Sequence, residues 1–357
     1  MAKRIVLTGG GSAGHVTPNL ALIPSLQREG WEVHYVGTAQ GIEAGLLKDV
    51  PGVTYHVVKS GKLRRYFDLK NFTDPFRVVA GAAQAASLMG QLKPSVVFAK
   101  GGFVSVPVVV GARLHGVPVV MHESDITPGL ANRLCKPFAQ CICTTFPECA
   151  QLLGEKAVQT GTPLRANLFE GSRARGLALC GFDGRKPVLM MVGGSLGAQA
   201  INQVLRAALD ALLPRYDVLH ICGKGNLEPS LEGRAGYCQF EYLSAEMPDA
   251  LACADIMLSR AGSNALSEIL ALRKPALLVP YPATASRGDQ ILNAQSLKRR
   301  SLAHVVAQEE LTSENLPDLL DALWRQRHAL TQAMAALPEA DGTAQVLAQI
   351  ERYAKKS

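Results

Sequence analysis

Residues 4–20 read RIVLTGGGSAGHVTPNL, and this stretch decides the predicted fold. The apolar, β-branched run Arg4–Thr8 predicts a buried strand, and the glycine-rich turn after it leads into the spacing of a helix. Such a turn presents backbone N–H groups at the positive end of a helix dipole. The stretch therefore predicts a site for phosphate or for a developing negative charge.

Gly9, Gly11 and Gly14 also satisfy the G-x-G-x-x-G pattern of dinucleotide-binding proteins. Such sites need an acidic residue at the end of the second strand, about 20 residues further on, to bind the ribose hydroxyls. The second predicted strand, Glu32–Val36, runs into a Gly-Thr pair instead. This argues against a nicotinamide or flavin cofactor, and the chain also lacks the P-loop pattern.

His15 follows the last glycine of the turn. An imidazole titrates near neutrality, which suits a general base. Taken alone, its position is equally compatible with a histidine that caps or packs at the start of a helix.

The chain has 357 residues, enough for two domains that each bury a substantial core. Its 37 Lys and Arg against 30 Asp and Glu give a net charge of +7, which favours anionic partners. No basic low-complexity tail or RNA-binding aromatic motif accompanies this charge, so we expect no nucleic-acid partner. The sequence contains no signal-peptide core and no apolar run of about 18 residues, so we expect a cytoplasmic protein that does not span the membrane.

Strands and helices alternate along the first half, which predicts a parallel sheet covered on both faces. The pattern restarts at Pro187–Val192, a strand that runs into a second glycine turn at residues 193–198. We therefore expect an α/β protein with two Rossmann-like parallel-sheet domains facing a central cleft, at residues 1–163 and 164–339. A C-terminal helix within residues 340–357 is expected to pack back on the first domain. The predicted strands are Arg4–Thr8, Glu32–Val36, Thr54–Val58, Val96–Ala99, Val117–His122, Cys141–Thr144, Pro187–Val192, Asp217–Cys222, Cys238–Tyr242, Ile256–Ser259, Pro275–Pro280 and Ala303–Val306.

Two motifs of the second half suit a sugar nucleotide. Residues 260–268, RAGSNALSE, follow a strand and open a helix, so their N–H groups offer a second anion site. Glu268 suits the two hydroxyls of a ribose, or is an ordinary glutamate near a helix start. Asp289 and Gln290 follow a proline-rich loop and suit sugar hydroxyls, although Asp289 also fits a helix cap.

Two motifs of the first half, at residues 100–105 and 122–125, follow strands and are expected on the same sheet edge as His15. A carboxylate there would raise the basicity of the histidine, although a structural role for His122 and Glu123 is as well supported. Residues 62–77 interleave aromatic side chains with Lys and Arg. This pattern fits the surface of an anionic membrane, or a solvated loop with its aromatic rings in the core.

The motifs occur in this order: the turn ending in Gly14-His15, residues 100–105 (KGGFVS), His122-Glu123, residues 161–165 (GTPLR), residues 193–198 (GGSLGA), residues 260–268 (RAGSNALSE) and residues 289–294 (DQILNA). Over nearly the whole chain, this order resembles the MurG family of bacterial peptidoglycan N-acetylglucosaminyltransferases. The resemblance implies a GT-B fold, with the acceptor bound mainly by residues 1–163 and the UDP-sugar mainly by residues 164–339.

Members of that family transfer N-acetylglucosamine from UDP-N-acetylglucosamine to the 4-hydroxyl of lipid I, which is undecaprenyl-diphospho-N-acetylmuramoyl-pentapeptide. The anomeric centre is inverted and lipid II is formed for peptidoglycan synthesis. The resemblance thus implies an enzyme of cell wall biogenesis, cell shape and cell division. Its expected location is peripheral, on the cytoplasmic face of the anionic cell membrane. Its expected partners are the UDP-sugar and the lipid-linked undecaprenyl-diphosphate acceptor. We expect no cofactor and no metal site.

The resemblance also implies roles for individual residues. His15 becomes the expected catalytic base, because an inverting transfer needs a base on the acceptor hydroxyl. Glu268 is the second expected catalytic residue and holds the ribose. The expected donor-binding residues are Ser12, Ala13, Gly14, Arg165, Ser195, Arg260, Ser263, Asn264, Ala265, Glu268 and Gln290. The expected acceptor or cleft residues are Gly11, Lys100, Glu123 and Asp125.

Three positions depart from the family pattern. Asp125 and Asp289 stand where the family usually has amide side chains, and Thr162 stands where it usually has Asn. These departures leave open a related GT-B glycosyltransferase that uses another lipid acceptor. A UDP-N-acetylglucosamine 2-epimerase, which shares the architecture and the donor, is the other alternative.

Overall fold

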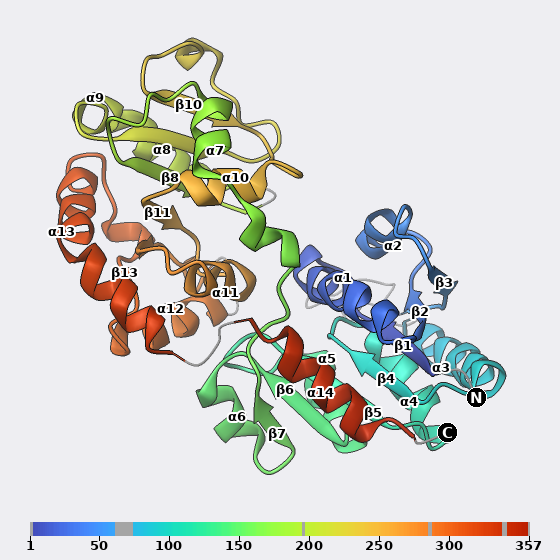
Figure 1. Cartoon of the computed structure of the whole chain (residues 1–357). Helices are drawn as coiled ribbons and strands as arrows, with labels where there is room; N and C mark the ends of the chain where they lie inside the picture. The colour runs from blue at the N-terminus through green and yellow to red at the C-terminus, as the bar shows by residue number, and fades with distance from the viewer. Residues whose placement is uncertain (1–2, 61–73, 195–196, 285–287, 338–340, 356–357) are drawn as a thin grey trace. The chain divides into compact units, whose positions relative to one another are not determined.

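The computed structural model describes residues 3–60, 74–194, 197–284, 288–337 and 341–355. Contacts divide the chain into two units, the first formed by Met1–Arg165 with Asp341–Ser357 and the second by Ala166–Ala340. Each unit is built on one parallel sheet with helices packed against it (Figure 1). The predicted α/β class with two parallel-sheet, Rossmann-like domains is confirmed. None of the described helices is long and apolar enough to cross a membrane.

The first unit contains a seven-stranded sheet in the order β3-β2-β1-β4-β5-β6-β7. The order reverses at β1, which pairs with β2 on one side and with β4 on the other. The carboxyl ends of β1 and β4 therefore lie at a switch point, where open α/β sheets bind ligands. The strands are β1 Arg4–Thr8, β2 Glu32–Gly37, β3 Val53–Val57, β4 Val96–Ala99, β5 Val119–Glu123, β6 Cys141–Thr144 and β7 Ala157–Gln159. The helices are α1 Ala13–Arg28, α2 Ile42–Leu47, α3 Asp74–Leu92, α4 Ser105–Leu114, α5 Leu130–Cys135, α6 Pro147–Leu153 and α14 Thr343–Tyr353.

Helices α1 and α14 form the core with one face of this sheet (Figure 1). Val346 and Ile350 of α14 are buried in the same cluster as Ile5 and Val120 of the sheet. The chain enters α14 through Asp341, whose Oδ1 accepts the backbone N–H of Leu164 at 3.1 Å. The last helix of the chain is therefore an integral part of the first unit.

Ile350 is 1% exposed, so we expect Ile350→Ala to lower the free energy of unfolding of the first unit by about 2–5 kcal/mol. The loss combines the lost transfer of the side chain from water with the cavity that the substitution leaves. Urea unfolding followed by circular dichroism measures it. The matched control is Glu351→Ala on the same helix, at a surface ion pair with Lys3, which should change stability by less than about 1 kcal/mol. Equal effects of the two variants would contradict the core role of α14.

The second unit contains a six-stranded parallel sheet in the order β10-β9-β8-β11-β12-β13. It repeats the switch of the first unit, because β8 pairs with both β9 and β11. The strands are β8 Val188–Val192, β9 Asp217–Ile221, β10 Tyr237–Phe240, β11 Ile256–Ser259, β12 Ala276–Leu278 and β13 His304–Val305. The main helices are α7 Arg173–Cys180, α8 Gln199–Ala207, α9 Leu209–Leu212, α10 Met247–Cys253, α11 Ser263–Ala271, α12 Asp289–Arg299 and α13 Leu316–Ala335.

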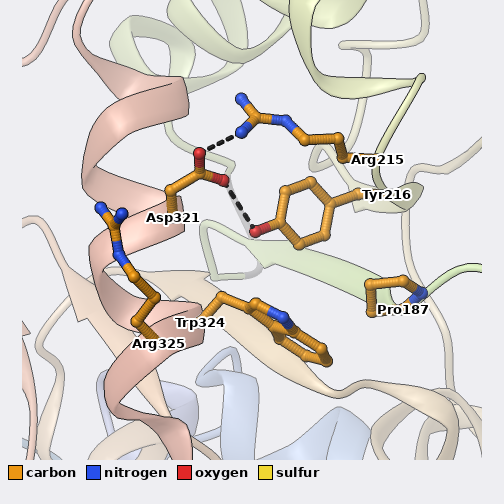
Figure 2. A pocket seen from close by; sticks show the side chains of 6 residues that line it. All are labelled: Pro187, Arg215, Tyr216, Asp321, Trp324 and Arg325. Atoms are coloured by element: carbon orange, nitrogen blue, oxygen red, sulfur yellow. Dashed lines mark hydrogen bonds and ion pairs between the residues drawn. The ribbon is translucent and has the colours of Figure 1, made fainter.

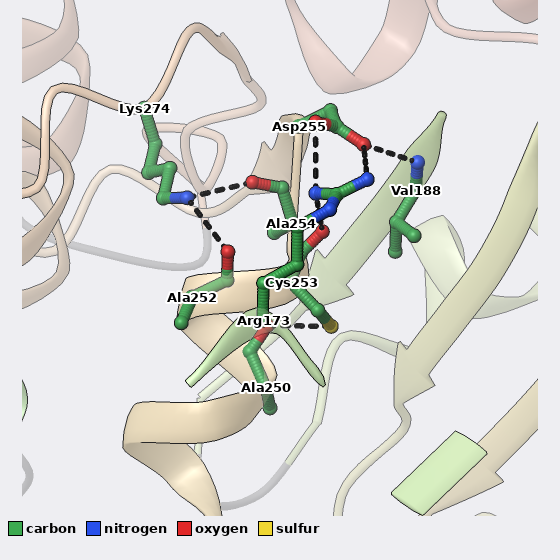
Figure 3. A network of polar contacts seen from close by, with 8 residues as sticks. All are labelled: Arg173, Val188, Ala250, Ala252, Cys253, Ala254, Asp255 and Lys274. Atoms are coloured by element: carbon green, nitrogen blue, oxygen red, sulfur yellow. Dashed lines mark hydrogen bonds and ion pairs between the residues drawn. The ribbon is translucent and has the colours of Figure 1, made fainter. Parts of the chain in front are cut away.

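Figure 3 shows the polar network that ties α7 to the amino ends of β8 and β11. The Asp255 carboxylate accepts both terminal N–H groups of Arg173, at 3.0 and 3.1 Å, and the backbone N–H of Val188 at 2.8 Å. Gly176 lets α7 approach α10, because a Cβ there would lie 2.2 Å from the carbonyl oxygen of Asp249. Helix α7 is thus bonded firmly to the second unit.

The predicted strands agree closely with the structure, and the differences lie at their ends. Strand β5 begins at Val119, two residues later than predicted, because the N–H of Val117 still bonds to the carbonyl of Ala112 at the end of α4. Strand β12 is shorter than the predicted Pro275–Pro280. Proline has no N–H to donate to a neighbouring strand. This explains why the paired strand lies between Pro275 and Pro280 and includes neither of them.

Candidate active site

The turns that follow β1 and β4 pack backbone against backbone. The N–H of Gly10 donates to the carbonyl oxygen of Gly101 at 3.3 Å. Gly102 has a positive φ of 81°, and a Cβ there would lie only 2.1 Å from the carbonyl oxygen of Gly10. Only glycine fits this position, since a side chain would push the two turns apart. The glycine motif at residues 100–105 therefore supports the first glycine turn directly.

His15 lies in the first turn of α1, and its ring is held by the glycine turn. The Nδ1 atom is 3.0 Å from the carbonyl oxygen of Gly10 and 3.0 Å from Oγ of Ser12. A carbonyl oxygen only accepts hydrogen bonds, so Nδ1 carries the proton in the neutral ring. The lone pair is then on Nε2, which is the atom that can take a proton from a substrate.

Asn132 of α5 lies beside the same turn and was not found from the sequence. A Cβ added to Gly101 would be 3.5 Å from Cδ2 of His15 and 3.3 Å from Oδ1 of Asn132, so both side chains border Gly101. The Asn132 amide donates to the carbonyl of His122 at 3.1 Å and to Glu123 at 2.8 Å. Its Oδ1 is buried and has no hydrogen-bond partner among the described residues.

Glu123 is a buried carboxyl group that organises the loop after β5. It accepts the N–H of Asp125 at 3.1 Å, the N–H of Gly129 at 2.9 Å and the Asn132 amide. Burial raises the pKa of Glu123, while the Gly129 N–H, the Lys100 ammonium and the Asn132 amide oppose that shift. The half-buried Asp125 is held in this loop by its backbone.

Lys100 is 2% exposed, and its Nζ donates to Oγ of Ser124. Burial lowers the pKa of Lys100 to about 8, while the nearby carboxylates of Glu123 and Asp125 partly oppose the shift. The ammonium form still predominates at neutral pH and places a positive charge behind the glycine turns. Lys100 therefore supports this site from within the protein rather than from its surface.

The lowered pKa of Lys100 predicts a pH-dependent stability. Between about pH 8 and the ordinary value of 10.5, the unfolded state binds more protons than the folded state, so the free energy of unfolding rises with pH. We expect the wild type to gain on the order of 3 kcal/mol relative to Lys100→Met between about pH 7 and pH 10, measured by urea unfolding. A difference between the two proteins that does not vary with pH would contradict the shift.

The second unit carries its own glycine turn after β8. Gly197 has a φ of 76°, and a Cβ there would lie 2.1 Å from the carbonyl oxygen of Cys222 at the end of β9. The hydroxyl of Tyr281, which follows β12, donates to the carbonyl of Gly197 at 3.4 Å. Ser195, expected at the donor, lies outside the described residues.

Arg260 was expected to face the donor, but its guanidinium lies within the second unit. The side chain is 5% exposed and stacks on the Tyr281 ring at 4.0 Å. It donates to the carbonyls of Val279 and Pro280 at 3.0 and 3.3 Å, and to Gln308 at 2.6 Å. These contacts fix the loop after β12, and burial lowers the pKa of the guanidinium.

Gln290, near the start of α12, bridges two turns at the carboxyl edge of the same sheet. Its Oε1 accepts the N–H of Ala261 at 3.3 Å and the N–H of Tyr281 at 3.2 Å. The oxygen is thereby oriented, and within the described residues the NH₂ group makes no hydrogen bond of its own. The other residues expected at the donor in this unit, half-buried on α11, are Ser263, Asn264, Ala265 and Glu268.

The expected donor residues of the first unit lie at and beyond its glycine turn. Ser12 is exposed, Ala13 and Gly14 are half-buried in the first turn of α1, and Gly11 is exposed. Arg165 is half-buried and is the last residue of the first unit before the chain enters the second.

A separate hollow of about 410 Å³ lies in the second unit, shown in Figure 2. Pro187 and Tyr216 precede β8 and β9, so the hollow lies at the amino edge of the sheet, opposite the glycine turn. Asp321 of α13 accepts hydrogen bonds from Arg215 and from the Tyr216 hydroxyl, and Trp324 meets the Tyr216 ring edge-on. Ligands of open α/β sheets bind at the opposite edge, so this hollow is not our candidate site.

Residues 5–144 match the Glycosyltransferase family 28 N-terminal domain, and residues 188–349 match the Glycosyltransferase family 28 C-terminal domain. The chain belongs to glycosyltransferase family 28. The two matched regions contain the two glycine turns, so both candidate sites belong to the regions by which the family is recognised.

Full-length relatives extend this family 28 assignment. The chain is 53% identical to a protein of Clostridium kluyveri over 98% of this chain and 99% of the relative. It is 52% identical to a protein of Geobacillus thermodenitrificans over 99% of this chain and 100% of the relative. Both relatives are named UDP-N-acetylglucosamine--N-acetylmuramyl-(pentapeptide) pyrophosphoryl-undecaprenol N-acetylglucosamine transferase.

Solved structures give the same fold. The chain is similar to Acinetobacter baumannii MurG, with a TM-score of 0.79 and 26% identity over 98% of this chain and 99% of the other. It also resembles a Listeria monocytogenes protein assigned as a UDP-N-acetylglucosamine 2-epimerase, with a TM-score of 0.69 and 14% identity over 99% of this chain and 98% of the other. The second likeness concerns the fold alone.

Proposed function

We propose that this family 28 enzyme transfers N-acetylglucosamine from UDP-N-acetylglucosamine to the 4-hydroxyl of lipid I, with inversion, and thereby forms lipid II. Relatives about half identical over their whole length carry the name of this activity. Lipid II is the peptidoglycan precursor, so the enzyme serves cell wall synthesis and, through it, cell shape and division. The proposed reaction needs no cofactor besides the two substrates.

The bond between Nδ1 of His15 and the carbonyl of Gly10 carries this proposal, because it leaves Nε2 as the basic nitrogen. In the proposed step, the acceptor oxygen attacks C1 of the sugar on the face opposite UDP. The hydroxyl proton passes to Nε2 of His15 as the new C–O bond forms. The bond from C1 to the diphosphate oxygen breaks, and its electron pair leaves with UDP.

The donor is proposed to bind mainly to the second unit. The diphosphate accepts hydrogen bonds from the amides of Ser263, Asn264 and Ala265 at the positive end of α11. Glu268 accepts bonds from the ribose hydroxyls, and the NH₂ group of Gln290 donates to the sugar or the diphosphate. The remaining proposed donor contacts are Ser12, Ala13, Gly14, Arg165 and Ser195.

Arg260 is better supported as a positioning residue than as a donor contact, because its guanidinium fixes the Val279–Tyr281 loop. Lys100, Glu123 and Asp125 are proposed to shape the acceptor side through the loop after β5, and Gly11 through the glycine turn.

Replacing His15 tests the catalytic proposal. With labelled UDP-N-acetylglucosamine and a soluble lipid I analogue, His15→Ala should lower kcat by about 10²–10⁴-fold, because the acceptor loses its base. The affinity for UDP should stay within about twofold, because the donor is proposed to bind mainly to the second unit and the His15 side chain is not among the proposed donor contacts. The matched control is His115→Ala, which changes an exposed histidine at the end of α4. Near-normal turnover of His15→Ala with saturating acceptor would contradict the proposed role of His15 as the base.

The same assay separates the alternative activities. Release of UDP together with a disaccharide-lipid product supports transfer to lipid I. Formation of N-acetylmannosamine without any acceptor would support a 2-epimerase instead, and transfer only to another lipid would support a related transferase.

We also propose that the enzyme binds peripherally to the cytoplasmic face of the anionic membrane. The net charge of +7 and the basic-aromatic stretch at residues 62–77 support this location, although residues 61–73 lie outside the described residues. On α5, Leu130 and Leu134 are each 45% exposed, and the exposed Arg133 lies between them. Apolar side chains beside cations suit an interface with anionic lipid.

Charge reversal at Arg64 and Arg65 should therefore weaken binding to anionic phospholipid vesicles, measured by sedimentation, and leave turnover of a soluble acceptor intact. The expected loss is about 1 kcal/mol per removed cation, or roughly fivefold each, and more after reversal. Reversal of Lys298 and Arg299 in the second unit is the control. Equal vesicle binding by the wild type and the Arg64/Arg65 variant would count against this surface.

A further inference from the structure

Glu43 of α2 is a buried acidic residue at the first glycine turn. The residue is 1% exposed, and both carboxylate oxygens are hydrogen-bonded. Oε2 accepts the backbone N–H of Gly11 at 3.3 Å. Oε1 accepts the backbone N–H and the hydroxyl of Thr38, at 3.0 and 2.7 Å. The carboxylate thus joins the turn after β1 to the turn after β2.

Glycines on both sides leave the space that this carboxylate occupies. A Cβ on Gly10 would lie 2.6 Å from the Glu43 carboxyl group, and one on Gly41 would lie 2.1 Å from it. A Cβ on Gly37 would lie 2.7 Å from Cγ of the same side chain. Real Cβ atoms do not approach other atoms so closely, so these glycines and the carboxylate fit one another.

The residue that Glu43 binds lies between the two groups that hold His15. Gly11 is flanked by Gly10, whose carbonyl accepts from Nδ1 of His15, and by Ser12, whose hydroxyl contacts the same nitrogen. Gly11 has a φ of 83°, so its own conformation is not fixed by a side chain. The hydrogen bond from its N–H to Glu43 restrains the turn at this point.

Two tyrosines fix the surroundings of this bond. The Tyr35 hydroxyl donates to the carbonyl of Gly9 at 2.6 Å, and the Tyr55 hydroxyl donates to the carbonyl of Thr38 at 2.8 Å. Burial raises the pKa of both hydroxyls, and the neighbouring Glu43 carboxylate raises them further, so both remain donors. The carboxylate therefore lies within a rigid frame that includes both turns.

We propose that Glu43 is a positioning residue of the transfer reaction, which acts by fixing the glycine turn so that His15 keeps its proton on Nδ1 and its lone pair on Nε2. This inference rests on the proposed role of His15 as the base. It predicts that Glu43 affects the chemical step through His15 and leaves donor binding unchanged.

The test compares Glu43→Gln with the wild type. Glutamine has nearly the same size, but its NH₂ group must face either the Gly11 N–H or the Thr38 donors. One hydrogen bond to the carboxylate is thereby replaced by repulsion between two donors. We expect kcat with the soluble lipid I analogue to fall about tenfold or more, and KM for UDP-N-acetylglucosamine to stay within about twofold. The matched control is Glu32→Gln, which changes a partly exposed glutamate at the amino edge of the same sheet and should leave kcat unchanged.

A double-mutant cycle with His15→Ala separates positioning from general structural damage. If Glu43 acts through His15, Glu43→Gln should change the residual rate of His15→Ala by less than about twofold. The same tenfold loss in both backgrounds, or no loss of kcat in Glu43→Gln alone, would overturn the proposal. Circular dichroism melting checks that the variants are folded. Thr38→Val, which removes only the hydroxyl donor to Glu43, should give a smaller loss in the same direction if Glu43→Gln does not fold.

A substrate-free measurement keeps this inference distinct from the proposed function. Nitrogen-15 NMR of the imidazole, assigned by comparison with His15→Ala, should show the Nδ1–H tautomer in the wild type and a mixed population in Glu43→Gln. An unchanged tautomer would overturn the positioning role even if His15 is the base. A loss of the Nδ1–H tautomer without any effect of His15→Ala on turnover would place the failure in the proposed function instead.

Discussion

The close approach of the turns after β1 and β4 is the contact on which the first unit depends. Their backbones touch where Gly102 meets the carbonyl of Gly10, at a point that has no room for a side chain. The carbonyl that Gly102 accommodates is also the one that accepts a bond from His15. The packing of the turns after two adjacent strands at the switch point therefore determines which nitrogen of the His15 ring carries the proton.

The second unit has the same strand topology, but its turns are held by polar side chains as well as by glycine packing. Its glycine turn packs against the carbonyl of Cys222 at the end of β9, while two polar side chains organise the remaining turns. Arg260 fixes the loop after β12, and Gln290 joins that loop to the start of α11. Because the Arg260 guanidinium and the Gln290 oxygen hold backbone groups, we propose that the donor at this edge is bound mainly by helix N-termini and by the NH₂ group of Gln290.

Sequence patterns predicted the strands well because a buried parallel strand is a short apolar run with glycine or proline at its ends. Strands β1, β4, β6 and β11 have the predicted bounds. The position of His15 at the end of a glycine turn also follows from local order alone. The tautomer of its ring does not, because it depends on which backbone atom the folded turn presents.

The sequence could not identify the residues whose roles depend on contacts between distant elements. In the sequence, Glu43 is an ordinary glutamate 32 positions after Gly11. Only folding brings its Oε2 atom within 3.3 Å of the Gly11 nitrogen. The same holds for Asn132 and Arg260. Asparagine and arginine are mostly exposed in proteins, so the sequence alone predicts a surface position for both, whereas their hydrogen-bond partners in the fold bury them. A usable signal was present around Glu43, since glycines at positions 37 and 41 mark room for a close neighbour.

Glu43 also affects the functional interpretation of residues 4–20, the stretch that decides the fold. The lack of a carboxylate at the tip of β2 argued against a dinucleotide site, and in the structure α2 supplies a carboxylate to the glycine turn itself. The Gly11 amide is thereby engaged with a negative group of the protein, so a phosphate next to this amide would meet repulsion from Glu43. In the mechanism that we propose, the amides at the start of α11 in the second unit bind most of the donor, and His15 of the first unit accepts the proton.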